Sequence, residues 1–241
     1  MPPLPTPPLP DSTIHVWCAT FSGLHTDLPH YISLLSLDEK ERSQRFHFAE
    51  DQNHYILGRG LLRTLLGSYI NMEPAQIEFN YGKYGKPALK SRSDLGIEFN
   101  LAHSNDLILY AIGRHARVGI DIEYIRPMSD MDNFAQHFFS ADEITMIGSL
   151  SGRAKEEAFF KLWTCKEAFL KAHGSGLATP LDQVEISLSN NGTANLESID
   201  TDKEKARHWH LKIFTPMQDY QAAIAIDGHD RQITFHKLQD F

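Results

Sequence analysis

The stretch "RVGIDIEYIRP" at residues 117–127 alternates apolar and polar side chains, a pattern typical of a half-buried β-strand. Because strand side chains point alternately to two faces, one face carries Val118, Ile120 and Ile122 and the other carries Gly119, Asp121 and Glu123. The two carboxylates form either the wet face of an ordinary strand or a pair of oxygen ligands for a hard cation such as Mg²⁺. Gly119 would leave room for a ligand to approach the backbone. The segment alone leaves both interpretations open.

Composition indicates a soluble globular protein. The chain has 241 residues, 41% of them hydrophobic and 22% charged, which suits one large domain or two small ones. No apolar run is long enough for a membrane span, and the start "MPPLPTPPLPDST" lacks the features of a signal peptide. Two cysteines make neither a disulfide framework nor a zinc cluster, which agrees with a reducing compartment. We therefore expect a cytoplasmic protein with no membrane partner.

The charge balance restricts the partners further. The net charge of −8 would repel nucleic acid, so we expect no nucleic-acid partner. Any polyanionic ligand would have to be held by a local basic cluster.

The predicted elements divide the chain into a proline-rich flexible start at 1–13 and two mixed halves at 14–117 and 118–241. We predict helices at 36–48, 51–70, 131–139, 140–150 and 153–172. Besides the opening strand, we predict strands at 14–21, 77–82, 97–103, 107–113, 184–188, 209–214, 220–226 and 233–238. Residues 189–208 are predicted as a polar hairpin loop. No internal repeat is evident in the residues themselves.

The long helix contains "FFKLWTCKEAFLKAHGSGL". Its helical periodicity gives one apolar arc, which holds Phe159, Leu162, Trp163, Phe169 and Leu170. Lys166 falls inside this arc, and Glu167 lies at its edge, one turn from Lys171. One interpretation is a surface Glu167/Lys171 pair worth ~0.3 kcal/mol with a snorkelling Lys166. The other is a third carboxylate beside Asp121 and Glu123, with Lys166 and Lys171 facing phosphate oxygens.

The motif "VGIDIE" followed by "LWTCKEAFLK" resembles the paired signature of the 4′-phosphopantetheinyl transferases. The chain from about residue 14 to 188 is similar to the Sfp-type, two-half subgroup of that family. Three upstream motifs agree in order: "RFHFAEDQNHYILGRGLLR" at 45–63, "GKYGKPAL" at 82–89 and "FNLAHSND" at 99–106. One departure is Ala102, where the family usually has serine, so this position offers no hydroxyl group to phosphate.

The resemblance implies an α+β fold of two similar halves related by a pseudo-twofold axis, with coenzyme A in the cleft between them. It implies transfer of 4′-phosphopantetheine from coenzyme A to a serine of an acyl or peptidyl carrier protein, which releases adenosine 3′,5′-bisphosphate. Because one chain carries both halves, we expect a monomer. The carrier would belong to fatty acid, polyketide or nonribosomal peptide synthesis.

The resemblance also implies the residues around the pyrophosphate. Asp121, Glu123 and Glu167 would hold Mg²⁺, with Mn²⁺ as the alternative ion. Glu167 is in addition the candidate base for the carrier serine. Lys171 would stabilise the α- and β-phosphates, and Lys166 is a secondary candidate because its arc faces the core. Asp121, Glu167 and Lys171 are thus the predicted catalytic residues.

The first half would bind the other end of coenzyme A. Arg59 and Arg63, at i and i+4, are expected to reach its 3′-phosphate together, although they also suit a solvated helix face. Gly85, Lys86 and Pro87 correspond to the family's adenine- and phosphate-binding turn, although they also suit a plain turn. His103 matches the family histidine that contacts phosphate, although a lone histidine is more often structural, and Asn100 is expected to bind coenzyme A as well. Between Phe46 and Asp51 the family is often basic and this chain offers only His47, so phosphate binding would depend more on the two arginines.

Two other classes of function remain open at the level of sequence. The first is a catalytically inactive coenzyme A or carrier-binding module, against which the intact acidic set argues. The second is a magnesium-dependent phosphohydrolase, which would use water in place of the carrier serine.

Overall fold

The computed structural model describes residues 6–174, 176, 179–189 and 193–238. The first half comprises β1 (Thr13–Thr20), α1 (Phe21–Leu24), α2 (Leu28–Leu34), α3 (Leu37–Ser43), α4 (Ala49–Ile70), β2 (Phe79–Tyr81), β3 (Pro87–Leu89), β4 (Ile97–Ser104) and β5 (Leu107–Arg114). The second half comprises β6 (Val118–Tyr124), α5 (Met131–Phe138), α6 (Ala141–Gly148), α7 (Gly152–His173), β7 (Val184–Leu188), β8 (Ala194–Ile199), α8 (Lys203–Ala206), β9 (Trp209–Phe214), β10 (Tyr220–Asp227) and β11 (Gln232–Lys237). Short 3₁₀ turns lie at His25–Asp27, Pro74–Gln76, Ser93–Leu95 and Leu181–Gln183.

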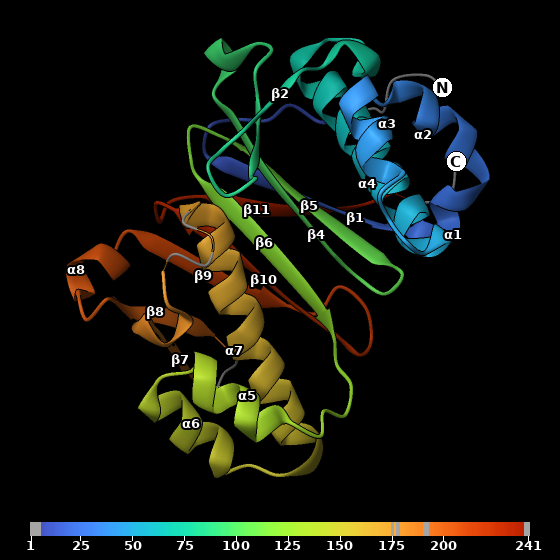
Figure 1. Cartoon of the computed structure of the whole chain (residues 1–241). Coiled ribbons are helices and arrows are strands. Elements are labelled where there is room, and N and C mark those ends of the chain that lie inside the picture. The colour runs from blue at the N-terminus through green and yellow to red at the C-terminus, as the bar shows by residue number, and fades with distance from the viewer. Residues whose placement is uncertain (1–5, 175, 177–178, 190–192, 239–241) are drawn as a thin grey trace.

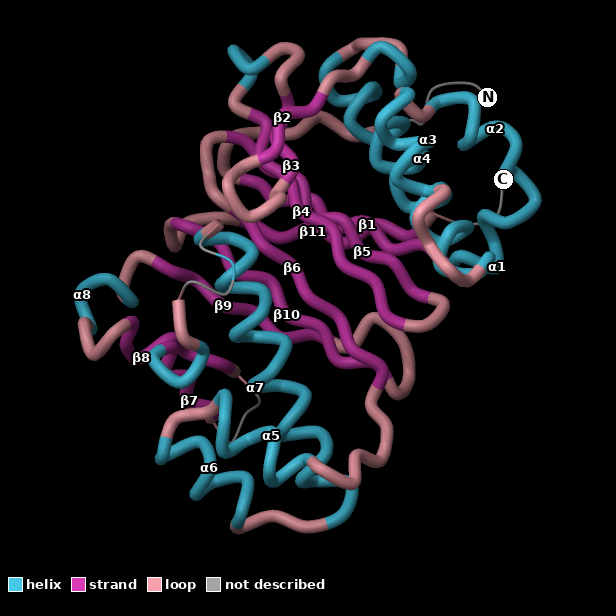
Figure 2. The backbone as a smooth tube through the Cα atoms, in the orientation of Figure 1, coloured by secondary structure: helices cyan, strands magenta, loops and turns pink. Residues whose placement is uncertain are grey.

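Two larger sheets lie in the middle of the molecule. The first has the strand order β11-β1-β5-β4 and the second the order β6-β10-β9; β2 pairs with β3, and β7 pairs with β8. Figure 1 shows β6 running beside β4, with α7 lying across the second sheet. In Figure 2 the strands gather centrally, with α1 to α4 toward one end and α5 and α6 toward the other.

Three apolar clusters stack these layers. One joins α4 to the outer face of the first sheet through residues such as Leu61, Phe99 and Ile112. A second joins the inner faces of the two sheets, and a third joins the second sheet to α7. The layers therefore follow the symmetric order helix, sheet, sheet, helix. This order confirms the predicted two-half α+β fold.

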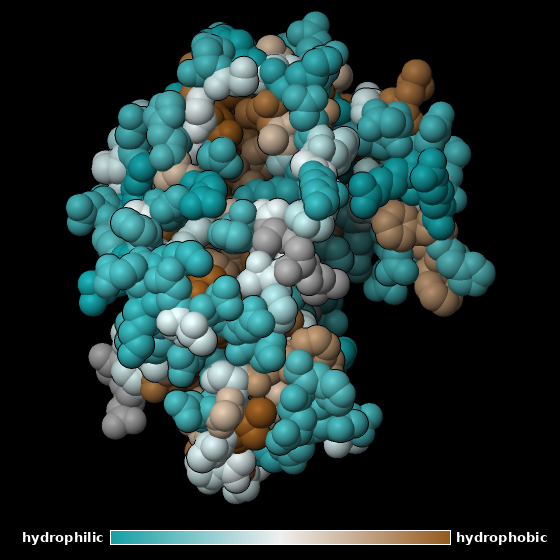
Figure 3. Space-filling model, turned by 60° about the vertical axis from the view of Figure 1, so that its left-hand side comes forward, coloured by the Kyte–Doolittle hydropathy of each residue, from teal (hydrophilic) through white to brown (hydrophobic). Residues whose placement is uncertain are grey.

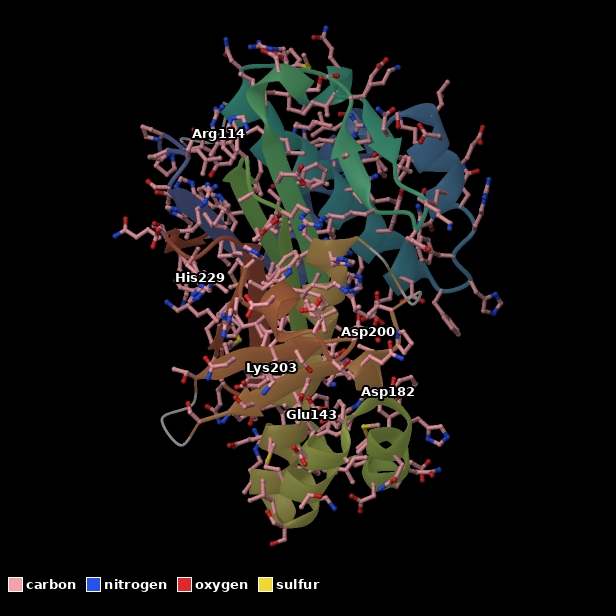
Figure 4. All side chains as sticks on the ribbon, turned by 90° about the vertical axis from the view of Figure 1, so that its left-hand side faces the viewer. Arg114, Glu143, Asp182, Asp200, Lys203 and His229 are labelled. Carbon is pink, nitrogen blue, oxygen red and sulfur yellow. The ribbon has the colours of Figure 1, made fainter. Side chains whose placement is uncertain are left out.

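A local motif occurs in both halves. Ser36 and Glu39 form a capping box at the start of α3, and Ser140 and Glu143 form one at the start of α6. Both glutamates are buried and pair with a cation on the long helix of their own half. Figure 4 labels Glu143, which lies close to the second-half strands. The matching tetrapeptides "SLDE" and "SADE" are a repeat that the sequence analysis did not detect.

The ends of the described chain meet in the first sheet. β11 pairs in parallel with β1, with Trp17 opposite His236. Residues 1–5 of the proline-rich start lie outside the described residues, but Leu9 is buried in the first-half core and its carbonyl oxygen accepts a hydrogen bond from Arg114 Nε. The expectation of a flexible start is therefore wrong at Leu9.

The predicted loop at 189–208 is also wrong in part. Residues 190–192 lie outside the described residues, but β8 and α8 occupy much of the rest. Ala194, Ile199 and Ala206 are buried in the core, so tertiary packing orders a segment that looks polar along the sequence. Among the described residues, no helix is long and apolar enough to cross a membrane.

Candidate active site

Strand β6 presents the two acids toward α7. Ile120 and Ile122 pack in the cluster between the two sheets, so the alternating residues Asp121 and Glu123 face the opposite way, as predicted. Asp121 is only 5% exposed. Its Oδ1 accepts a hydrogen bond from Lys171 Nζ at 2.6 Å, whereas its buried Oδ2 has no partner.

Helix α7 lies directly against this strand. A Cβ atom built on Gly119 would be 2.1 Å from the backbone oxygen of Ala168 and 2.3 Å from the backbone nitrogen of Ala172. The space beside Gly119 is therefore filled by the α7 backbone, and the expectation that a ligand enters there is wrong. This close approach places Glu167 and Lys171 opposite the acids of β6.

The pKa values of the three acids are raised. Burial raises the pKa of Asp121 despite the nearby Lys171 ammonium. Burial and the charge of Asp121 raise the pKa of Glu123 and that of Glu167. Within the described ranges, however, no three acidic, histidine or cysteine side chains are already arranged to hold a metal ion. The predicted ligand set is thus gathered in one region but is not preassembled.

A cavity of about 260 Å³ lies between the two halves. It is lined by Tyr84, Gly85, Lys86, Asn100, Glu167, Leu170, Lys171, Gly174 and Gly176. Five of the predicted site residues therefore share one cleft, although they come from distant parts of the chain. Pro87 does not line this cavity; it begins β3, where it pairs with Tyr81.

Two first-half residues of this cavity also bind the second half. Lys86 Nζ donates hydrogen bonds to the Val118 oxygen at 3.0 Å and to the Ala172 oxygen at 3.5 Å, and burial lowers the pKa of this amine. Asn100 Oδ1 accepts a hydrogen bond from the Ile120 nitrogen at 2.8 Å. Both side chains therefore hold the halves together at the edge of the cleft.

A second cavity of about 160 Å³ contains His103. His54 and Arg59 line it as well, together with Asp51 and Phe46. Burial lowers the pKa of His103, and so do the charges of His54 and Lys171, so this histidine lies within electrostatic reach of Lys171 in the first cavity. The sequence analysis missed His54, and its position within the 45–63 motif was the available signal.

Arg63 is not available to a phosphate. Its side chain is 1% exposed and donates to Glu39 Oε2 at 2.7 Å and to the backbone oxygens of Pro74 and Ile77. The expectation that both arginines reach the 3′-phosphate is therefore wrong for Arg63. Arg59 donates to Glu39 Oε1 at 2.7 Å and to the Tyr81 hydroxyl, but it also lines the second cavity.

Lys166 is likewise a structural residue. It is fully buried, and its Nζ pairs with Glu143 Oε2 at 2.8 Å and donates to the backbone oxygens of Leu181 and Val184. These partners satisfy the ammonium within the second-half core. The prediction that Lys166 binds the cofactor is therefore wrong in this structure.

Comparison with known proteins agrees with this geometry. Residues 117–225 match the 4′-phosphopantetheinyl transferase superfamily, and residues 20–114 match the N-terminal region described for 4′-phosphopantetheinyl transferase. The 4′-phosphopantetheinyl transferase HetI of Nostoc is 38% identical over 236 residues, which cover 96% of each chain. The chain belongs to the 4′-phosphopantetheinyl transferase superfamily. Transfer of a 4′-phosphopantetheinyl group is accordingly its activity.

Other phosphopantetheinyl transferases are similar at lower identity. Sfp of Bacillus subtilis is 30% identical over 186 residues, which cover 74% of this chain and 81% of that protein. A holo-(acyl-carrier-protein) synthase of Bacillus anthracis has been solved in complex with CoA (3′,5′-ADP). The superposition covers 45% of this chain and 92% of the synthase chain, with 23% sequence identity and a TM-score of 0.39.

Proposed function

We propose that this phosphopantetheinyl transferase moves the 4′-phosphopantetheine group of coenzyme A onto a serine of an acyl or peptidyl carrier protein. The serine oxygen forms a bond to the β-phosphorus, and the bond from that phosphorus to the bridging oxygen breaks. Adenosine 3′,5′-bisphosphate leaves, and the serine proton passes to a base. The supporting observation is the cleft between the halves, where Lys86 and Asn100 meet Glu167 and Lys171.

Lys171 and Glu167 are the proposed catalytic residues of the cleft. The Lys171 side chain is 31% exposed, so it is available to stabilise the charge that develops on the departing phosphate. Glu167 lines the same cavity, and its raised pKa suits a group that accepts a proton from serine, directly or through one water molecule.

The donor set fits a hard cation. Asp121 offers a buried oxygen without a partner, and Glu123 and Glu167 add carboxylates whose pKa values are raised by burial and by the charge of Asp121. We propose that these three residues hold Mg²⁺, or Mn²⁺ in its place, with the substrate phosphates completing the ligands. Such a cation would supply positive charge against the pyrophosphate.

The remaining site residues are assigned to coenzyme A. Gly85 and Lys86 line the first cavity, where the turn that ends at Pro87 would face the nucleotide. His103 and Arg59 line the second cavity and are the proposed phosphate contacts there. A monomeric state and a cytoplasmic location stay predictions.

The test uses the purified chain with coenzyme A, Mg²⁺ and apo-carriers from fatty acid, polyketide and nonribosomal peptide synthesis. Intact-mass spectrometry should show one phosphopantetheinyl addition on at least one carrier, and chromatography should show an equal amount of adenosine 3′,5′-bisphosphate. Release of the nucleotide without modification of a carrier would instead identify a phosphohydrolase. Binding of coenzyme A with neither product would identify an inactive binding module.

A further inference from the structure

Strands β4 and β6 lie side by side at the junction of the two halves, yet they belong to different sheets. Two β4 side chains bond to the backbone of β6 along this edge. Asn100 Oδ1 accepts from the Ile120 nitrogen at 2.8 Å, and Ser104 Oγ accepts from the Tyr124 nitrogen at 3.0 Å. Side chains of the first half therefore occupy backbone donors of the strand that carries the acids.

Ser104 makes a second contact that Asn100 does not make. Its Oγ donates a hydrogen bond to Glu123 Oε2 at 3.2 Å. A hydroxyl has one proton, and because the oxygen already accepts from Tyr124, the proton is directed at the carboxylate. Ala102, which lies between Asn100 and Ser104 on the same face of β4, has no polar side-chain atom to offer.

We propose that Ser104 is a positioning residue, which restrains the Glu123 carboxylate at the acidic site, where it is available to bind the cation. The first half then contributes to the acidic site through a hydroxyl, although all three acids belong to the second half. This inference rests on the proposed function, in which Glu123 is a metal ligand. Residues that orient ligands from outside typically change metal affinity by about 10- to 100-fold when they are removed.

The test measures Mn²⁺ binding to the apo-protein by calorimetry and by electron paramagnetic resonance, independently of turnover. Ser104→Ala should weaken Mn²⁺ binding by about 10-fold. In the absence of metal, the affinity of the Ser104→Ala variant for coenzyme A should stay within about 2-fold of that of the wild type, because Ser104 lines neither cavity. Ser104→Thr, which keeps the hydroxyl, should restore most of the Mn²⁺ affinity.

Ser198→Ala is the matched control. Ser198 Oγ donates the same kind of hydrogen bond to Glu185 Oε2, at 2.9 Å, between β7 and β8 and away from both cavities. This variant should leave Mn²⁺ binding unchanged. In a Glu123→Ala background, Ser104→Ala should have no further effect on Mn²⁺ binding, because the side chain that Ser104 orients is gone.

Three results would overturn the inference. They are wild-type Mn²⁺ affinity in Ser104→Ala, an equal loss in Ser198→Ala, or an undiminished effect of Ser104→Ala in the Glu123→Ala background. Each would leave the proposed transferase function intact if the wild type still binds Mn²⁺ and modifies a carrier. A wild type that neither binds Mn²⁺ nor modifies any carrier would remove the proposed function, and the inference with it.

Discussion

Asp121 carries its charge where burial makes charge costly. The side chain is 5% exposed, and Lys171 satisfies only one of its two oxygens. The Lys171 ammonium does not compensate fully, since the pKa of Asp121 is still raised. The apo fold therefore disfavours the charge of Asp121, although the reaction needs this residue in its ionised form.

Asp121→Asn tests this conflict through the pH dependence of stability. A carboxyl whose folded pKa is raised favours folding below its unfolded pKa, and that contribution is lost as the pH rises through the folded pKa. As the pH rises from the unfolded pKa of Asp121 through its folded pKa, the free energy of unfolding of the wild type should therefore fall relative to that of the variant. Transfer should fall by about 10²-fold or more.

The measurement is chemical denaturation of both metal-free proteins across the acidic and neutral range, with circular dichroism as a check on the fold. A stability difference that does not vary with pH would show that Asp121 is not under this strain. Normal turnover by the variant would remove Asp121 from the proposed site.

Arg63 is expected to act on stability rather than on substrate choice. Arg63→Ala leaves Glu39 buried with one partner fewer and should lower the free energy of unfolding by about 3–5 kcal/mol. The ratio of the Michaelis constants for coenzyme A and 3′-dephospho-coenzyme A should not change. If the variant has normal stability and a higher Michaelis constant for coenzyme A but not for 3′-dephospho-coenzyme A, Arg63 does contact the 3′-phosphate.

At the scale of elements, the contact between β6 and α7 sets the site. An added methyl group at Gly119 would collide with backbone atoms of α7, so the helix has to move away from the strand. Glu167 and Lys171 would move with it, relative to Asp121. Gly119→Ala should therefore reduce transfer by about 10²-fold, since a displacement near 1 Å suffices for such a loss.

Gly148→Ala is the control for that variant, because a Cβ atom at Gly148 on α6 meets nothing within 4 Å. It should keep normal activity. Steady-state kinetics of the two variants decides the question, and full activity in Gly119→Ala would mean that the β6–α7 spacing is unimportant for transfer.

Elements with a clear periodicity could be predicted from the sequence, and those ordered by distant contacts could not. Alternation placed Asp121 and Glu123 on one face of β6, and helical spacing placed Glu167 beside Lys171 on α7. Helical spacing also led to the wrong prediction that Arg63 and Lys166 bind phosphate. It shows on which face of a helix a cationic side chain lies, but not which anion that side chain pairs with. Their partners Glu39 and Glu143 lie far along the chain, and β8 and α8 escaped prediction because their buried residues are few.

At the scale of the whole molecule, the net charge of −8 bears on how the carrier docks. We expect the carrier to present acidic helices around its serine, so that the long-range field opposes the encounter. We predict that the carrier docks on residues 128–161, which lie between the two acidic motifs in the sequence and form α5, α6 and the start of α7. Arg153 and Lys155 there are already paired with acids, and Phe134 and Phe138 are partly exposed. Figure 3 shows hydrophobic residues among hydrophilic ones in the lower part of the molecule, toward which α5 and α6 lie in Figure 1.

Carrier binding should therefore respond only modestly to added salt. Phe138→Ser should raise the Michaelis constant for carrier without changing the affinity for coenzyme A, whereas Leu37→Ser, an exposed apolar residue of the first half, should change neither. Titrations of apo-carrier at low and physiological ionic strength are the measurement. A steep loss of carrier affinity with salt would show that basic steering dominates.

The parallel pairing of β11 with β1 bears on how the protein is made. On a ribosome β1 emerges early, but its partner follows only after nearly all of the described chain has been synthesised. During that time one edge of β1 is open to other strands, which is a known route to aggregation. The second sheet needs only β6, β9 and β10 and can close beforehand. The half that is translated first is therefore the last to be completed.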